Sequence, residues 1–127
     1  MCDFAGMKEP EMVKRRPVVV VSPRLRYRKG LCAVVPMSTT RPQPPEAYHH
    51  RIRFGEPLPA PYDSEYQWVK ADMIYTVAFH RLFLLTTGKD DQGKRQYDAR
   101  VISKADLRTI QSCILHGLGM ADLTTYM

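Results

Sequence analysis

Hydrophobic residues along this chain fall into short runs that are separated by clusters of proline, glycine and polar residues. The run PVVVVS at residues 17–22 is rich in β-branched side chains and predicts a strand buried on both faces, with Pro17 tolerated at its start. A second run, LCAVVPM at residues 31–37, predicts another strand. The short connection between the two runs favours an antiparallel hairpin.

Two later segments also carry sheet patterns. In AYHHRIRF, at residues 47–54, alternate positions of a third strand share one side: Tyr48, His50 and Ile52. QWVKADMIYTV, at residues 67–77, predicts a fourth strand. Lys70 and Asp72 occupy alternate positions of that strand, so we expect both side chains on the same face.

After residue 77 the predicted elements are short, and from Ser103 onward the pattern changes to helical spacing. Residues 78–85 predict a short helix, and residues 88–102 predict a turn that leads into a last short strand. Ser103 and Asp106 form a capping box at the start of a C-terminal helix. One stripe of that helix contains Leu107, Ile110, Ile114 and Leu118. The elements together predict a mainly β (α+β) fold, a small curled antiparallel sheet with a C-terminal helix.

The length of 127 residues is that of one domain, and 44% hydrophobic residues argue against disorder. We therefore expect a single domain over residues 1–127.

MCDFAG at the N-terminus supplies only a stub of apolar residues, so we expect either a first strand that begins upstream of Met1 or a short edge strand. The apolar stretch at residues 77–85 is too short to cross a membrane, and the acidic N-terminal segment does not fit a signal peptide.

Net charge is +6, which favours a polyanionic partner. The three cysteines are odd in number and far apart, which favours a reducing, cytoplasmic setting over a disulfide framework. No Cys-x-x-Cys pair exists, and the adjacent His49 and His50 would point to opposite faces of a strand. The sequence therefore predicts neither a metal site nor a cofactor.

Four stretches occur in an order and spacing that resemble the PemK/MazF family of toxin endoribonucleases, the toxins of bacterial toxin–antitoxin pairs. They are KRRPVVVVSP, CAVVPMSTT, WVKADM and SKADLRTIQSCILHGLG, and with them the resemblance covers nearly the whole chain. The resemblance implies an SH3-like barrel, a homodimer, a cognate antitoxin and metal-independent cleavage of single-stranded RNA. In that reaction the ribose 2′-hydroxyl attacks the neighbouring phosphate and leaves a cyclic phosphate and a 5′-hydroxyl.

The catalytic arginine of the family matches Arg16, whose backbone Pro17 restricts. A guanidinium there could bind a phosphate with two hydrogen bonds. The hydroxyl position of the family can be matched in two ways, by Ser38 or by Thr39, and both lie where a strand ends. Without the resemblance, the arginine is better interpreted as a surface cation beside a strand, and either hydroxyl equally well as part of a polar turn.

The resemblance also implies roles for Asp72 and Lys70. Asp72 could accept the proton of the 2′-hydroxyl, and Lys70 could donate to the leaving group or hold a phosphate, although Lys replaces the Arg of some relatives. The alternative is a same-face ion pair that contributes little to stability. The first loop, AGMKEPEMVK, lacks the histidine that some relatives place there.

Further cations could line the path of an RNA strand, namely Lys14, Arg15, Arg24, Arg26, Arg28 and Lys29. Tyr27, Tyr66 or Trp68 could stack on bases, although for Trp68 we favour a place in the core. A non-catalytic alternative remains on the same fold: a module that binds nucleic acid or a protein, as gyrase poisons of this superfamily do.

Overall fold

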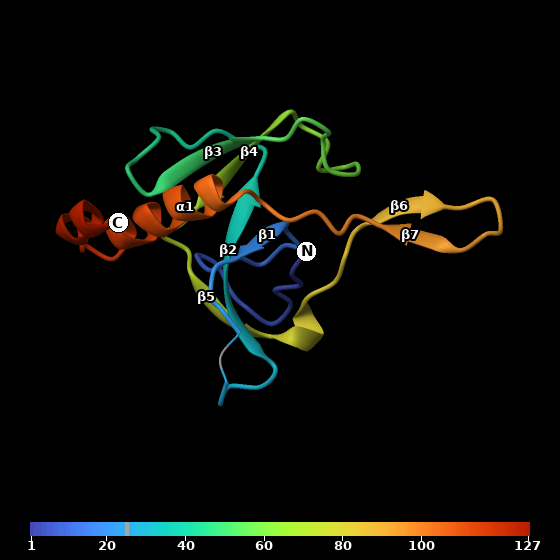
Figure 1. Cartoon of the computed structure of the whole chain (residues 1–127), viewed down its shortest axis with the longest axis horizontal. Helices are drawn as coiled ribbons and strands as arrows, with labels where there is room; N and C mark the ends of the chain where they lie inside the picture. The colour runs from blue at the N-terminus through green and yellow to red at the C-terminus, as the bar shows by residue number, and fades with distance from the viewer. Residues whose placement is uncertain (25) are drawn as a thin grey trace.

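Strand β2 (Leu31–Ser38) is the central element of a curled, five-stranded antiparallel sheet (Figure 1). The computed structural model describes residues 1–24 and 26–127. One edge of β2 pairs with β1 (Val18–Val20). Its other edge pairs first with β5 (Tyr75–Ala78) and then with β4 (Tyr66–Lys70), which in turn pairs with β3 (His49–Arg53).

The change of partner along β2 curls the sheet. Residues 31–34 of β2 pair with β5, whereas Met37 and Ser38 pair with β4. The strand order β1–β2–β4–β3 leaves β1 and β3 at opposite edges, so the sheet is curled without closing into a complete barrel. The prediction of a mainly β fold with a curled antiparallel sheet is confirmed.

The antiparallel hairpin of β1 and β2 is also confirmed. β1 is shorter than the predicted strand at residues 17–22, and the prediction that it is buried on both faces is wrong, because Val20 is 50% exposed. β1 is an edge strand of the sheet, so part of its surface has no neighbouring strand.

The predicted single strand at residues 67–77 is two strands, β4 and β5, with a turn between them. In that turn the amide of Met73 donates to the carbonyl of Lys70 at 3.1 Å. The chain turns because β4 and β5 pair with opposite ends of β2. The strand therefore ends at Lys70, so the expectation that Asp72 lies in the same strand as Lys70 is wrong. The Ala71 amide still donates to the Tyr48 carbonyl at 3.1 Å, and Ala71 is buried, as Val69 is.

Two segments after β5 differ from the prediction. The predicted helix at residues 78–85 is only a 3-10 turn, η1 (Phe79–Arg81). The predicted last strand is one half of a hairpin, β6 (Thr86–Lys89) with β7 (Arg95–Tyr97). This hairpin projects from the rest of the molecule, and all residues of its two strands are exposed (Figure 1).

Helix α1 (Lys104–Gly117) has Ser103 as its N-cap, as predicted: the amide of Asp106 donates to Ser103 Oγ at 3.0 Å. The Asp106 carboxylate accepts from the Ser103 hydroxyl at 3.0 Å. Ile110 of the predicted stripe is buried, but Leu118 is 57% exposed because the helix has already ended. A 3-10 helix, η2 (Ala121–Tyr126), follows. None of the helices within residues 1–24 and 26–127 is long and apolar enough to cross a membrane.

The two faces of the sheet bury two separate cores. The helix-side core contains Val35 of β2 together with Ile110 and Cys113 of α1. The N-terminal core, on the other face, contains Val34 of β2 and is covered by Cys2 and Phe4. Val34 and Val35 are neighbours in β2 and both are fully buried, which contributes roughly 1.5–3 kcal/mol for each side chain. β2 is thus fixed from both sides.

Candidate functional site

A row of four residues crosses the sheet at the end of β2. Ser38 lies opposite Trp68 of β4, and Trp68 lies opposite Arg51 of β3. On the other edge of β2, the amide of Met37 donates to the carbonyl of Pro17 at 2.8 Å, which continues the β1 ladder by one residue and sets Arg16 opposite Ser38. We call these residues the cross-strand row: Arg16, Ser38, Trp68 and Arg51.

The cross-strand row lies on the sheet face that points away from α1. Met37 and Val69, the neighbours of Ser38 and Trp68, are buried in the helix-side core, and successive side chains of a strand point to opposite faces. Directly opposite residues of an antiparallel pair have Cα atoms about 4.5–5.5 Å apart. The sheet therefore brings Arg16 and Ser38 together, as the sequence predicts.

Arg16 is half-buried, and its Nε atom is buried without a hydrogen-bond partner within the described part of the chain. Its backbone is fixed, because Arg16 and Cys2 exchange two hydrogen bonds of 2.9 and 3.2 Å. A buried donor without a partner is rare in folded proteins and costs free energy. The salt bridges of the described residues do not include Arg16, so the guanidinium of this backbone-anchored residue is suited to binding an anion.

Ser38 and Thr39 differ in exposure and orientation. Ser38 is 6% exposed, and its Oγ accepts a hydrogen bond of 3.1 Å from the amide of Thr40, which leaves the hydroxyl hydrogen available to another acceptor. Thr39 is exposed and lies in the bend after β2. The strand register gives Ser38, rather than Thr39, the position opposite Arg16.

Lys70 is the last residue of β4, and Asp72 lies within the turn that follows. Lys70 is half-buried, two positions from Trp68 on the same strand, so it shares the face of the cross-strand row. Asp72 is exposed and lies against the C-terminal end of α1, where a Cβ atom on Gly117 would come within 3.0 Å of the Asp72 Cα. The structure therefore places Lys70 beside the row and Asp72 away from it.

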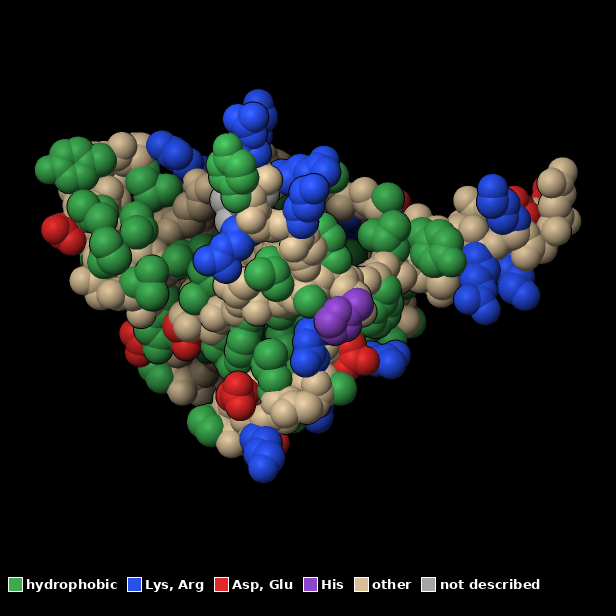
Figure 2. Space-filling model, turned by 90° about the horizontal axis from the view of Figure 1, so that it is seen from below, with side chains coloured by type: hydrophobic (Ala, Val, Ile, Leu, Met, Phe, Trp, Pro, Cys, Tyr) green, Lys and Arg blue, Asp and Glu red, His purple; other side chains and the backbone are tan. Residues whose placement is uncertain are grey.

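The cations predicted to line an RNA path divide into two groups. Lys14 is exposed near Arg16, while the guanidinium of Arg15 lies 3.3 Å from the Asp3 carboxylate and 5.5 Å from the centre of the Phe83 ring. Arg24 and Arg26 are exposed in the loop between β1 and β2. That loop is at the opposite end of β2 from Ser38, and Lys and Arg side chains gather around it (Figure 2).

One member of the cross-strand row was missed from the sequence, and another was assigned to the wrong place. For Trp68, a candidate for base stacking, the favoured place in the core is wrong, because Trp68 is half-buried and belongs to neither core cluster. Arg51 was not selected, although its guanidinium carbon lies 4.3 Å from the centre of the Tyr66 ring. The alternation of cations in HHRIR was the available signal, but only the register of β3 against β4 shows which residues these cations face.

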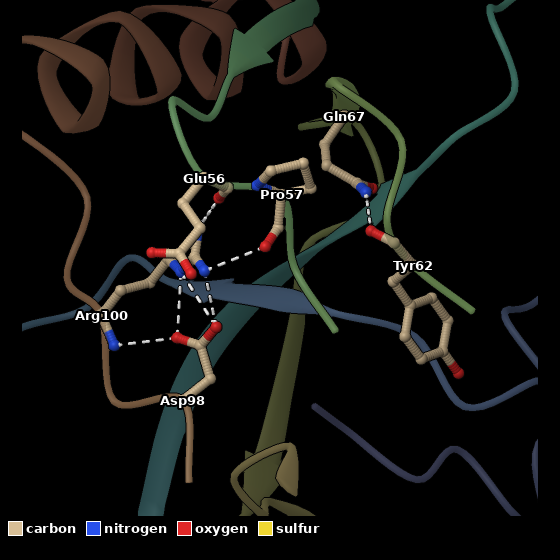
Figure 3. A network of polar contacts seen from close by, with 6 residues as sticks. All are labelled: Glu56, Pro57, Tyr62, Gln67, Asp98 and Arg100. Atoms are coloured by element: carbon tan, nitrogen blue, oxygen red, sulfur yellow. Dashed lines mark hydrogen bonds and ion pairs between the residues drawn. The ribbon is translucent and has the colours of Figure 1, made fainter. Parts of the chain in front are cut away.

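A polar network fixes the connection between β3 and β4 (Figure 3). Arg100 donates to both carboxylate oxygens of Asp98, and its remaining donors reach the backbone carbonyls of Glu56 and Pro57. The guanidinium holds the pKa of the Asp98 carboxyl below its ordinary value. Nearby, the amide of Gln67 donates to the Tyr62 carbonyl at 2.9 Å. The network supports the β3–β4 hairpin and is separate from the row.

Two other features are separate from the cross-strand row. A largely apolar cavity of about 500 Å³ lies against the helix-side core, with Val19, Met37, Phe54, Leu58 and Ile102 among its lining residues. The three cysteines are buried, and burial raises the pKa of each thiol, so they stay protonated and are poor nucleophiles.

Comparison with known proteins relates the chain to one family, and two similar proteins illustrate the relationship. A model of the PemK-like, MazF-like toxins of type II toxin–antitoxin systems matches residues 1–116. The uncharacterised protein YifN of Escherichia coli strain K12 is 32% identical over 82 residues, 62% of this chain and 54% of YifN, so the chain spans about half the length of this relative. The Mycobacterium tuberculosis toxin MazF-mt6 has a similar fold, with a TM-score of 0.58, 15% identity, and coverage of 87% of this chain and 92% of that one.

Proposed function

The chain belongs to the PemK-like, MazF-like toxin family of type II toxin–antitoxin systems, and from this premise we propose that it is a metal-independent endoribonuclease that cuts single-stranded RNA. The observation that carries the proposal is the position of Arg16. Arg16 lies in register with the strand-end hydroxyl of Ser38, and its guanidinium takes part in none of the salt bridges within residues 1–24 and 26–127. This pair is suited to hold one phosphodiester.

In the proposed reaction the phosphate binds between Arg16 and Ser38. The 2′-oxygen of the preceding ribose forms a bond to phosphorus, the bond from phosphorus to the 5′-oxygen breaks, and the products are a cyclic phosphate and a 5′-hydroxyl. Water takes up the proton of the 2′-hydroxyl and supplies one to the 5′-oxygen. The guanidinium and the Ser38 hydroxyl donate to the non-bridging oxygens, where negative charge grows in the transition state.

Fixed donors of this kind need no reorganisation during the reaction, which is why they accelerate it. Removing one such donor in other enzymes costs about 10²–10³ in rate. Ser38 takes the hydroxyl role because the register sets it opposite Arg16. Lys70, on the same face, binds a neighbouring phosphate as a point charge.

The substrate and the partners follow from the same proposal. Single-stranded RNA is the substrate because a flexible strand can align the attacking and leaving oxygens. Toxins of this family act beside a cognate antitoxin, and we expect the antitoxin to cover the cross-strand row. We further propose that the protein forms a homodimer and acts in the cytoplasm, where its RNA substrate is found.

A second candidate function, binding without cleavage, is favoured by one observation. The cross-strand row contains no carboxylate or imidazole, and Asp72 lies within the turn after β4, against Gly117 of α1. A module of this kind would bind RNA, or a protein in the manner of a gyrase poison, and would not need the Arg16 guanidinium for chemistry.

A cleavage assay separates the two functions. The purified chain is incubated in EDTA with a mixed-sequence single-stranded RNA, and the fragment ends are analysed for cyclic phosphates. We expect such fragments with the natural chain and with Arg15→Ala, and a loss of at least about 100-fold with Arg16→Ala. Equal cleavage by Arg16→Ala would refute the proposal, and no cleavage by the natural chain would favour the binding module.

A further inference from the structure

The outer face of the β3–β4 hairpin, which points away from the helix-side core, carries cations opposite aromatic rings. Ile52 of β3 and Val69 of β4 are buried in that core, so the residues that alternate with them point outward. Their three cross-strand pairs are Arg53 with Tyr66, Arg51 with Trp68, and His49 with Lys70.

The residues of this face differ in the contacts that their side chains make within the protein. Arg53 is paired with Glu65 at 2.8 Å, and Arg51 lies over the Tyr66 ring. The Trp68 ring makes neither an aromatic pair nor a cation–π contact with any described residue. Trp68 is therefore the aromatic ring of this face that has no stacking partner of its own.

The positive charge of this face is only partly neutralised. The salt bridges found in the described ranges include Arg53 but neither Arg51 nor Lys70. Both of those cations flank Trp68, one directly across the hairpin and the other two positions along β4. An aromatic ring between two unneutralised cations is the combination that binds single-stranded nucleic acid, because bases stack and phosphates pair with the cations.

We propose that Trp68 stacks on a nucleotide base next to the scissile phosphate, with Arg51 and Lys70 binding the phosphates of the same strand. The inference rests on the proposed function for the position of the scissile phosphate, since Ser38 lies directly opposite Trp68. The RNA strand then runs across the sheet along the cross-strand row, from Arg16 over β2 and β4 toward β3. Every base has a π-face, so this contact strengthens binding with little preference for sequence.

The test uses the single tryptophan of the chain as its own reporter. The full chain is titrated in EDTA with a 2′-O-methyl RNA of mixed sequence, which cannot be cleaved because its attacking oxygen is blocked. Stacking on Trp68 is expected to quench the fluorescence in proportion to binding. Trp68→Leu, followed by an independent binding measurement, is expected to bind about 5- to 100-fold more weakly, and Trp68→Phe is expected to recover part of the affinity.

Matched variants distinguish the contribution of this face to RNA binding from that of the net positive charge of the protein. Tyr126→Leu removes an exposed aromatic ring from η2, and Arg95→Ala removes an exposed cation from the β6–β7 hairpin. Both are expected to bind the RNA within about twofold of the natural chain, whereas Arg51→Ala binds more weakly. A thermal melt of each variant shows that it is folded.

The outcomes distinguish this inference from the proposed function. The stacking site is refuted if RNA leaves the fluorescence of the natural chain unchanged and Trp68→Leu binds RNA with the natural affinity. This holds even if the chain cleaves RNA. If RNA quenches the fluorescence but ordinary RNA is not cleaved, the result supports the stacking site and refutes the proposed nuclease activity. Equal quenching by poly-glutamate would show that the face binds acidic polymers, proteins included, without using bases, and would also overturn the inference.

Discussion

Arg16 and Ser38 lie opposite each other at the end of the β1–β2 ladder, although the whole hairpin loop separates them in the sequence. The hydrogen bond from the Met37 amide to the Pro17 carbonyl, at 2.8 Å, extends the ladder to this pair. Each residue is also fixed from its other side, Arg16 by Cys2 and Ser38 by β4. The backbones of the two residues are thus held by strand pairing on both sides.

The first prediction concerns the chemistry of the Arg16 side chain. Arg16→Lys keeps the charge but loses the planar set of donors, so we expect cleavage between that of the natural chain and that of Arg16→Ala. The measurement is the rate of cleavage at saturating RNA. If Arg16→Lys cleaves as fast as the natural chain, positive charge alone is sufficient at this position. That result would contradict the proposal that the Arg16 guanidinium binds the phosphate with two hydrogen bonds.

The second prediction separates the two hydroxyl candidates. Ser38→Ala removes the donor opposite Arg16, and we expect the cleavage rate to fall by about 10²-fold or more. Thr39→Ala alters an exposed residue in the bend after β2 and is expected to change the rate by less than about fivefold. The reverse order of effects would show that Thr39, and not Ser38, contacts the phosphate.

The third prediction concerns Asp72. Its position within the turn after β4 and against Gly117 argues against the role of a base that the family resemblance implies. We therefore expect Asp72→Asn to cleave RNA at close to the natural rate, with an unchanged pH profile. A loss of about 10²-fold or more, together with a shift of the acidic limb of that profile, would restore Asp72 as the proton acceptor.

The fourth prediction concerns stability and pH. The Asp98 carboxyl has a lowered pKa because it accepts hydrogen bonds from Arg100. Its contribution is therefore present above the unfolded-state value of about 3.9 and is lost as pH falls through the lower folded-state pKa. We expect Asp98→Asn to reduce the free energy of unfolding by about 1 kcal/mol at pH 7.

Urea unfolding of both chains checks this prediction. The difference between the natural chain and Asp98→Asn should shrink as pH falls below about 4, because the natural carboxyl is then also neutral. Asp91→Asn, at the exposed tip of the β6–β7 hairpin, serves as the control and is expected to change little. A difference that stays constant down to acidic pH would attribute the effect to packing rather than to the ion pair.

The features that the sequence predicts correctly depend mostly on local signals. The β1–β2 hairpin follows from two apolar runs with a short connection, and the start of α1 follows from Ser103 and Asp106, three residues apart. The juxtaposition of Arg16 and Ser38 was available through the family resemblance. Each of these signals lies within one segment or one known motif.

The errors concern pairing between distant segments. The alternating pattern at residues 67–77 does not reveal that β2 takes two partners on one edge, so the turn that displaces Asp72 was missed. The pairing of Arg51 with Trp68 depends on the register of β3 against β4. A shift of one residue would move every side chain to the other face, and the hydrophobic pattern of a short strand does not exclude that shift.

Strand β2 has a consequence for regulation, because it is paired along both edges and buried on both faces. Amide hydrogens in such a strand exchange with solvent mainly when the whole domain opens, in contrast to those in a flexible lid. The proposed catalytic groups would then remain assembled for as long as the protein is folded. An inhibitor would have little local disorder to exploit and would act by occupying the surface of the sheet.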